Sequence, residues 1–227
     1  EDQLKSLPKM KPENKSLILS KLEADNAKKF DVVNCQFAVH YFFKSPEILG
    51  NFMSNITKFT KPSGYALFTT FDADLLNSEF MKSSQKEPRI TTYYTTDDGQ
   101  KKVVFDVVKK YKGDDVNQVG LPIDVHLPVF ADGVYIVEYL VPKTIFINTM
   151  KENGFSIVDT GTFNDVYQKH RQFFEEVAHN EANEQNKQFY MKVKSFYTTS
   201  DDFGYSKLHR YYIFRRDDTS VTKMRRT

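Results

Sequence analysis

FDVVNCQFAVHYFFKSPEILGNFMSNITKFTKPSGYALFTT, residues 30–70, holds two short apolar runs on either side of a helix-like segment. The first run, FDVVNC (30–35), has the β-branched composition of a strand buried on both faces. The second run, YALFTT (65–70), predicts another buried strand. Between them apolar residues recur at helical spacing, and Ser45 and Pro46 supply an N-cap and a first helical residue. The order strand, helix, strand predicts a βαβ unit with parallel strands and a right-handed crossover.

The elements expected outside this unit change character along the chain. Upstream, residues 16–30 predict a short amphipathic helix with Ser16 as N-cap, preceded by a loop. Downstream, the pattern predicts a helix at 72–84, strands at 89–96, 101–112 and 121–127 with a hairpin turn at 97–100, a helix at 142–154, a strand at 155–163, a helix at 164–180 and a strand at 209–216. The chain is therefore expected to be α/β, with a mixed sheet and an antiparallel insertion.

Length, net charge, apolar runs and cysteine count limit the classes of protein to which the chain can belong. The 227 residues suffice for one domain with a core, and a net charge of +2 gives no global field for a polyanion. The sequence contains no run of eighteen apolar residues, so it predicts no membrane-spanning helix. The one cysteine, Cys35, allows no internal disulfide and no cysteine metal cluster, which suits a reducing, intracellular compartment. We expect Cys35 to be a buried thiol at a strand end.

Aromatic and polar side chains crowd the segment that follows the first strand, QFAVHYFF (36–43). Ligands of open α/β sheets bind outside the carboxyl ends of the parallel strands. One helical turn there would put Phe37, His40 and Tyr41 on one face, beside the polar Gln36. Such a face suits a planar base, because stacking contributes about 1–3 kcal/mol per base. The next two phenylalanines are expected to belong to the core.

The same residues carry a family resemblance. FDVVNCQFAVHYFF and LGNFMSNITKFTKPSGYALFTT resemble the central part of the mRNA cap guanine-N7 methyltransferases, most nearly the C-terminal methyltransferase domain of large-DNA-virus capping enzymes. The likeness continues through VYIVEYLVP (134–142), KENGFSIVDTGTFNDVY (151–167) and RYYIF (210–214). It implies an enzyme that transfers a methyl group from S-adenosyl-L-methionine to N7 of the cap guanine. It also implies the C-terminal part of a Rossmann-like class I methyltransferase, with residues 1–227 as one partial domain and 85–135 as an antiparallel insertion contributing to the cap pocket.

The resemblance assigns roles to individual residues. It implies a cap pocket formed by Phe37, His40, Tyr41, Phe71, Glu138 and Tyr211, in which the last two orient the cap. Gln36 and Tyr41 are implied to lie beside S-adenosylmethionine. Tyr212 is the neighbouring alternative to Tyr211, one residue away.

Glu138 has a chemical rationale for this role. An ionised carboxylate only accepts hydrogen bonds, and guanine presents two adjacent donors, N1–H and the exocyclic amine. The same charge would favour the positive charge that grows on the base during N7 methylation. Without the resemblance, a glutamate here would be expected only to complement a helix dipole. Because N7 carries no proton, no general base, nucleophile or metal is expected, and catalysis would rest on alignment.

Two departures from the family pattern matter. Phe71 stands where the family usually has proline, and it could stack on a base or fill space. The glycine-rich D-x-G-x-G-x-G cofactor loop is not in the 227 residues. We therefore expect the C-terminal part of a domain, with an exposed apolar edge beside residues 30–34 that leaves this segment alone insoluble or unable to bind S-adenosylmethionine.

Two other functions stay open from the sequence: a non-catalytic, methyltransferase-like stimulatory subunit, and a methyltransferase that acts on a small molecule. The expected partner is the capped 5′ end of RNA, and other capping-enzyme domains or a stimulatory subunit could be fused or bound. Lys109, Lys110 and Lys112 are candidates for phosphate contacts, although such runs are usually solvated faces. A viral protein of this kind would be expected in the host cytoplasm, the virion or both.

Overall fold

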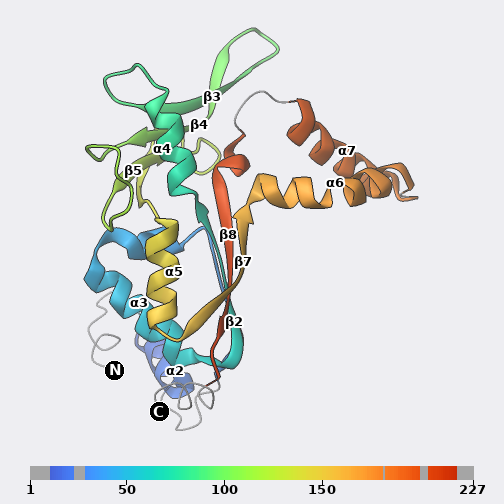
Figure 1. Cartoon of the computed structure of the whole chain (residues 1–227). Helices are drawn as coiled ribbons and strands as arrows, with labels where there is room; N and C mark the ends of the chain where they lie inside the picture. Colours follow the sequence, from blue (N-terminus) through green and yellow to red (C-terminus); the bar gives the residue numbers. More distant parts are fainter. Residues whose placement is uncertain (1–10, 23–28, 181, 200–203, 219–227) are drawn as a thin grey trace.

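A mixed four-stranded sheet forms one half of the molecule (Figure 1). The computed structural model describes residues 11–22, 29–180, 182–199 and 204–218. The strand order of this first sheet is β1-β2-β8-β7. Its strands are β1 (Phe30–Gln36), β2 (Thr60–Phe71), β7 (Phe155–Thr162) and β8 (His209–Arg216). β1 and β2 are parallel, whereas β8 runs antiparallel to both of its neighbours. The predicted α/β class with a mixed sheet is confirmed.

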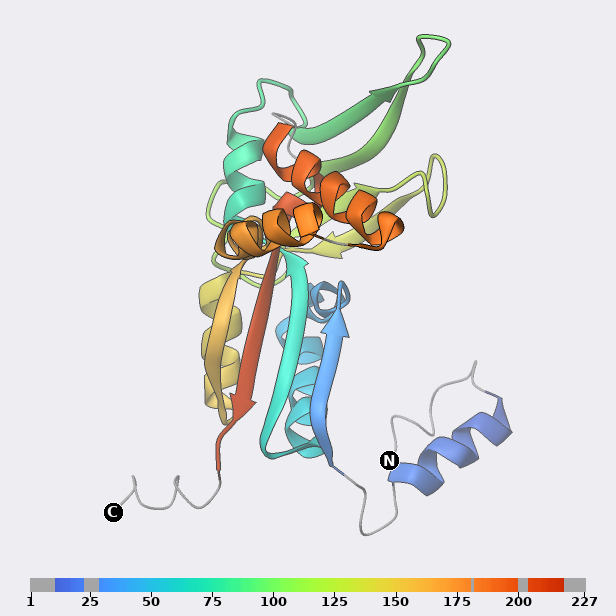
Figure 2. The same cartoon turned by 90° about the vertical axis from the view of Figure 1, so that its right-hand side faces the viewer.

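The βαβ unit is completed by α3 (Pro46–Phe59). The Ser45 hydroxyl accepts a hydrogen bond from the Ile48 amide at 3.3 Å, which confirms the predicted N-cap. α3 and α5 (Lys143–Glu152) lie on the same face of the first sheet, as Figure 2 shows. Buried apolar side chains of both helices and of β2 and β8 form the core between them: Leu49, Phe52, Met53, Ile56, Phe146, Met150, Ala66, Phe68, Tyr212 and Phe214.

The prediction that β1 is buried on both faces is wrong. Phe30 and Val32 keep more than half of their surface exposed, whereas Val33 and Cys35 are partly buried against the core. Among the residues that the structure describes, β1 is the edge strand and pairs only with β2, and α3 and α5 cover one face of the sheet. Alternate side chains of β1 therefore point away from the helices, and Cys35 is half-buried rather than buried.

A second, antiparallel sheet of four strands stands above the carboxyl ends of β1 and β2 (Figure 1). Its strands follow in chain order: β3 (Arg89–Thr95), β4 (Lys101–Lys109), β5 (Pro122–His126) and β6 (Tyr135–Tyr139). α4 (Ala73–Met81) packs on it through Leu76 and Phe80, against Phe105 and Ile123 of the sheet. The sheet therefore extends to residue 139, and Glu138 lies in a strand and not at the start of a helix.

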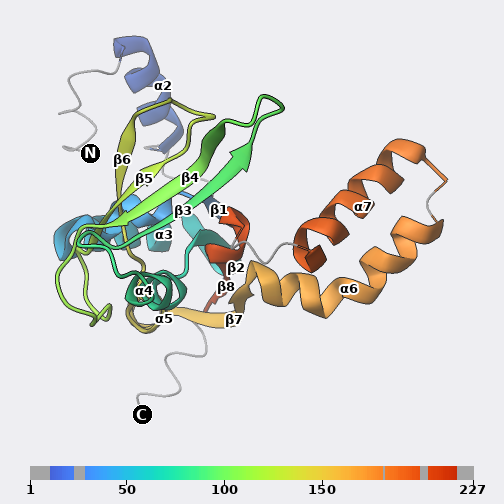
Figure 3. The same cartoon turned by 90° about the horizontal axis from the view of Figure 1, so that it is seen from above.

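Two helices, α6 (Phe163–Asn180) and α7 (Glu184–Thr199), pair as a hairpin that extends away from both sheets (Figure 3). α6 was predicted and α7 was not. α2 (Pro12–Leu22) starts four residues before Ser16, so Ser16 is not its N-cap, and residues 23–28 of the predicted helix lie outside the described part. Two 3-10 helices, η1 (Val39–Lys44) and η2 (Tyr205–Leu208), flank the first sheet. None of the described helices is both long and apolar enough to cross a bilayer.

Two glycines give a matched pair of stability predictions. A Cβ on Gly64, where β2 passes β1, would lie 2.9 Å from the Asp31 carbonyl oxygen and 3.0 Å from that of Lys61. A Cβ on Gly50, inside α3, would meet nothing within 4 Å. We expect Gly64→Ala to lower the free energy of unfolding by about 1–3 kcal/mol through overpacking. Gly50→Ala should raise it by about 0.5–1 kcal/mol through helix propensity. Chemical denaturation measures the free energy of unfolding of both variants. Changes in the same direction would contradict the backbone geometry.

Candidate functional site

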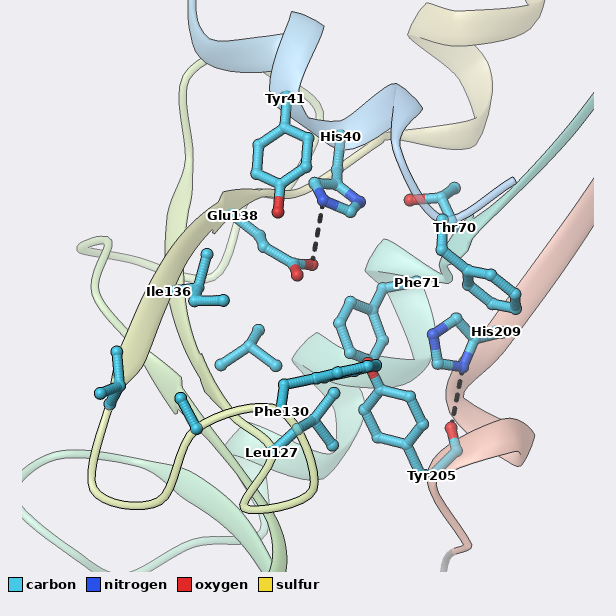
Figure 4. Close-up of a pocket in the computed structure, with 14 residues that line it drawn as sticks. His40, Tyr41, Thr70, Phe71, Leu127, Phe130, Ile136, Glu138, Tyr205 and His209 are labelled. Atoms are coloured by element: carbon cyan, nitrogen blue, oxygen red, sulfur yellow. Dashed lines mark hydrogen bonds and ion pairs between the residues drawn. The ribbon is translucent and has the colours of Figure 1, made fainter. Parts of the chain in front are cut away.

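A pocket of about 420 Å³ lies where the two sheets meet (Figure 4). It opens beyond the carboxyl ends of β1 and β2, where ligands of open α/β sheets bind. One wall comes from η1, one from the end of β2 and the start of β8, and one from β5, β6 and their connecting loop. The lining residues are Phe37, His40, Tyr41, Thr70, Phe71, Val125, Leu127, Phe130, Ala131, Val134, Ile136, Glu138, Tyr205 and His209.

The chain leaves β1 through a strained residue. Phe37 has a φ of 50°, in the left-handed region that costs a residue with a Cβ about 1–3 kcal/mol. Its amide donates to the carbonyl oxygen of Thr69 at 3.0 Å and lies 3.1 Å from the Thr69 hydroxyl. This turn starts η1, which places His40 and Tyr41 on the pocket with their ring centroids 4.2 Å apart. All three aromatic residues line the pocket, as predicted, but Phe37 precedes η1 and is not part of one helical turn with the other two.

Glu138 approaches this group from the other sheet. It lies in β6 opposite Ile123, and only 9% of its surface is exposed. Its Oε2 lies 3.4 Å from His40 Nε2, the contact drawn as a dashed line in Figure 4. The contact is not aligned as a hydrogen bond, and His40 Nε2 has no other hydrogen-bond partner among the described residues. A buried carboxylate thus faces the pocket without a strong partner in the described part of the chain.

Burial sets the charge of this group. It raises the pKa of Glu138 to about 7, because a carboxylate is poorly solvated there. Burial, with a smaller effect of His209, lowers the pKa of His40 to about 4. Burial likewise lowers the pKa of His209 to about 4, against smaller opposing effects of backbone hydrogen bonds. Near neutral pH both histidines are therefore neutral, and Glu138 gains and loses its proton.

The opposite wall is aromatic. Phe71 stacks on His209 with ring centroids 4.3 Å apart, and Tyr205 meets both rings edge-on or tilted. The carbonyl oxygen of Tyr205 accepts a hydrogen bond from His209 Nδ1 at 2.8 Å, which fixes the imidazole. Phe71 is 3% exposed, so most of its surface fills space and one edge lines the pocket. Tyr205 and His209 were not predicted as site residues; the one signal was that His209 begins the predicted strand 209–216.

The structure brings together five of the six predicted cap-pocket residues: Phe37, His40, Tyr41, Phe71 and Glu138. It does not bring Tyr211 to them. The Tyr211 hydroxyl donates to Asp159 Oδ2 at 2.9 Å and lines a separate hollow beside α6. Tyr212 is buried in the core. The β8 residue on the pocket is His209, because the pocket lies at the start of the strand. Tyr211 shares its face of the sheet but lies two residues farther along, next to Gly161 of β7.

Gln36 lies at the end of β1, one residue before the pocket, with an exposed side chain that donates a hydrogen bond to Asn34 Oδ1. These two amides are polar groups at the carboxyl end of a parallel strand, so they fit one side of a nucleoside-like cofactor there. Gln36 does not line the pocket, and its predicted contact with S-adenosylmethionine stays a prediction. No described residue supplies the glycine-rich turn of a cofactor loop.

The lysines predicted to contact phosphates are partly engaged within the chain. Lys109 Nζ lies 3.0 Å from Asp114 Oδ1 and over the ring of Tyr111. Lys110 pairs with Glu87 and lies 3.5 Å from Asp124. These carboxylates reduce the local positive charge, and the Lys109 side chain is mostly buried rather than part of a solvated face. Lys112 is exposed.

Residues 13–203 match the model of the mRNA (guanine-N(7))-methyltransferase domain. The chain belongs to the mRNA (guanine-N(7))-methyltransferase family. The resemblance expected from the sequence is thereby confirmed, and S-adenosylmethionine is the methyl donor of this family.

Relatives of this methyltransferase chain include large-DNA-virus proteins. It is 30% identical to a probable mRNA-capping enzyme of Acanthamoeba polyphaga mimivirus, over 96% of the chain and 20% of that protein. It is 24% identical to the mRNA-capping enzyme catalytic subunit of fowlpox virus, over 83% of the chain and 21% of that protein. The chain thus spans about a fifth of the length of these relatives. A solved S-adenosylmethionine-dependent methyltransferase from Clostridium acetobutylicum matches 92% of the chain and 73% of its own, with a TM-score of 0.41 and 11% identity.

Proposed function

We propose that the pocket binds the guanine of a 5′ RNA cap and presents its N7 for methylation. The observation that carries this proposal is Glu138, a buried carboxylate without a strong partner, facing an aromatic pocket. Such a group is costly to bury unless a ligand supplies hydrogen-bond donors. Guanine supplies two, N1–H and the exocyclic amine, side by side on its Watson–Crick edge.

The pairing of the guanine with Glu138 would set the orientation of the base in the pocket. With its Watson–Crick edge on Glu138, guanine would direct N7 away from β6 and across the pocket. The rings of Tyr41, Phe71 and Tyr205 offer apolar surface to the base, and the neutral imidazoles of His40 and His209 add no positive charge that would oppose alkylation. The negative charge of Glu138 would favour the cation that forms on the base.

No proton has to leave N7, so the chain needs no general base. When bound, S-adenosylmethionine supplies a methyl group activated by its sulfonium. The residues of this chain hold the base, exclude water from one of its edges and fix the angle at which N7 is presented. Gln36 and Tyr41 are proposed to contact the cofactor, and Tyr211, which lies outside the pocket, to support the β7–α6 corner through Asp159.

Methyl transfer from S-adenosylmethionine to GpppA-capped RNA tests the proposed function. The assay uses the longest natural polypeptide that contains these residues, and the product is digested to locate the methyl group. We expect 7-methylguanosine. No transfer, with cap binding intact, would indicate a non-catalytic stimulatory subunit. Transfer to a small molecule but not to the cap would indicate the other alternative.

The proton on Glu138 gives a pH prediction. Its pKa is raised to about 7, so the carboxylate that accepts both guanine donors predominates above pH 7 and is lost as the pH falls. We expect the affinity for GpppA to be constant above about pH 8 and to fall roughly tenfold per pH unit below about pH 6. Equilibrium dialysis between pH 5.5 and 8.5 measures it.

The control is Glu138→Gln, which removes the titrating group and should give a flat, weak profile. His40 and His209 have pKa values of about 4, so they do not titrate in this window. Affinity that instead rises as the pH falls would contradict the role of an ionised Glu138.

We also propose the setting of the protein. Its partner is capped RNA, held beyond the cap by phosphate contacts. Other capping activities, on the same polypeptide or bound to it, would supply the capped substrate. The single cysteine and the viral relatives favour a reducing compartment such as the host cytoplasm.

A further inference from the structure

Phe130 is an aromatic side chain that the core does not use. It lies in the loop between β5 and β6, and 77% of its surface is exposed although it lines the pocket. Figure 4 shows its ring extending from the loop into the pocket, at the end opposite Tyr41 and Glu138. Among the described residues, each of the other rings that line the pocket contacts a second ring, and Phe130 contacts none.

The backbone that carries this side chain is well fixed. The Phe130 amide donates to the Leu127 carbonyl oxygen at 3.0 Å. His126 Nδ1 donates to the Val134 carbonyl oxygen at 2.9 Å, which joins the two ends of the loop. Gly133, at a φ of +72°, allows the return turn. The loop backbone holds the Phe130 ring in position while the ring itself stays exposed. The ring is therefore preorganised to contact a ligand in the pocket.

The position relative to Glu138 suggests what would cover it. A base whose edge pairs with Glu138 lies between β6 and the wall of Phe71, His209 and Tyr205. One face of such a base would lie against that wall, which leaves the other face to the exposed ring of Phe130. Stacking on a purine would remove apolar surface of the ring from water, and the ring face would attract the positive charge that develops on the base.

We infer that Phe130 stacks on the cap guanine, closes the open face of the base and thereby positions N7. This inference rests on the proposed function and adds a residue from the β5–β6 loop. Stacking should favour the methylated, cationic base over the neutral one, since cation–π attraction adds to dispersion.

The neighbouring residue supplies a matched control. Val129 is 84% exposed and lies in the same loop, but it lines a different hollow on the outer face of the second sheet, together with Tyr94 and Lys102. Phe130→Ala should lower kcat/KM for GpppA-capped RNA about 10- to 100-fold, and Phe130→Tyr should preserve it within about threefold. Val129→Ala should change it less than about twofold, because its side chain does not face the base.

A tryptophan introduced at position 130 gives a direct readout, and the 227 residues contain no tryptophan of their own. In the longest natural polypeptide, the fluorescence added by Phe130→Trp is followed during titration with GpppA, and that added by Val129→Trp serves as reference. We expect GpppA to quench the first and not the second. Binding of GpppA to the unsubstituted protein is measured in parallel by equilibrium dialysis.

The outcomes separate the two proposals. GpppA that binds the unsubstituted protein without quenching the tryptophan at 130, or quenches both tryptophans equally, overturns the role of Phe130 and leaves the proposed function standing. GpppA that does not bind the unsubstituted protein overturns the proposed function and the role of Phe130 with it.

Discussion

Glu138→Ala should lower kcat/KM for GpppA-capped RNA by about 10²- to 10⁴-fold. Two hydrogen bonds to a charged group contribute about 1.5–3 kcal/mol each, and each 1.4 kcal/mol is tenfold in rate. The loss should appear in both KM and kcat, since the carboxylate holds the base in the ground state and favours the cation formed in the transition state. Steady-state kinetics with varied capped RNA measures both parameters.

Folding controls separate this effect from a loss of structure. Because burial raises the pKa of Glu138, its ionised form destabilises the folded state above pH 7, and replacing it should not lower the Tm at pH 8. Asp124→Ala is the matched variant: Asp124 lies on the neighbouring strand β5, on its outer face toward Lys110. We expect its kcat/KM to stay within about threefold of the unsubstituted value. If the kcat/KM of the Glu138→Ala protein also stayed within about threefold of the unsubstituted value, the role of the carboxylate would be contradicted.

Asp72→Ala should lower the free energy of unfolding by about 3–5 kcal/mol. Asp72 is 2% exposed, caps α4 through a hydrogen bond from the Leu75 amide at 2.9 Å, and accepts another from Arg210 Nε. Removing the carboxylate leaves a mostly buried guanidinium unpaired and a helix start uncapped. Phe71 and His209 are the sequence neighbours of this pair, so the pair also fixes the aromatic wall of the pocket.

The matched control is Asp74→Ala. Asp74 lies in the first turn of the same helix and is exposed, so it contributes only through the helix dipole, about 0.5 kcal/mol. Urea denaturation followed by circular dichroism measures both variants. A loss of less than about 1 kcal/mol in Asp72→Ala would show that the ion pair does not fix the two strands.

Local patterns in the sequence predicted much of this fold. Ser45 and Pro46 mark the start of α3, and the expected final strand has the bounds of β8, His209–Arg216. These features depend on a few adjacent residues. α7 was missed because its sequence carries little amphipathic pattern, and it is supported by packing on α6, where Phe174 meets Tyr190.

The site was predictable where its residues are close in sequence or belong to a resembling motif. Phe37, His40 and Tyr41 follow β1 directly, and Glu138 lies in a motif that resembles the family. Tyr205 and His209 were missed because they reach the pocket only through the pairing of β8 with β2, in which His209 lies opposite Phe71. A register between strands so distant in sequence leaves no local pattern.

The prediction that β1 is buried on both faces was wrong for a similar reason. An apolar run indicates that its side chains can be buried. It does not indicate whether one or both faces of the sheet are covered. Phe30 and Val32 lie on the face of the first sheet opposite α3 and α5, so they stay exposed among the described residues.

The pairing of Glu138 with the Watson–Crick edge is tested most directly by changing that edge. IpppA-capped RNA carries hypoxanthine, which keeps N1–H and N7 but lacks the exocyclic amine. We expect the unsubstituted protein to prefer GpppA over IpppA by about tenfold or more in kcat/KM, and Glu138→Ala to reduce the preference to less than about twofold. A Glu138→Ala protein that retains the full preference would show that another group reads the base.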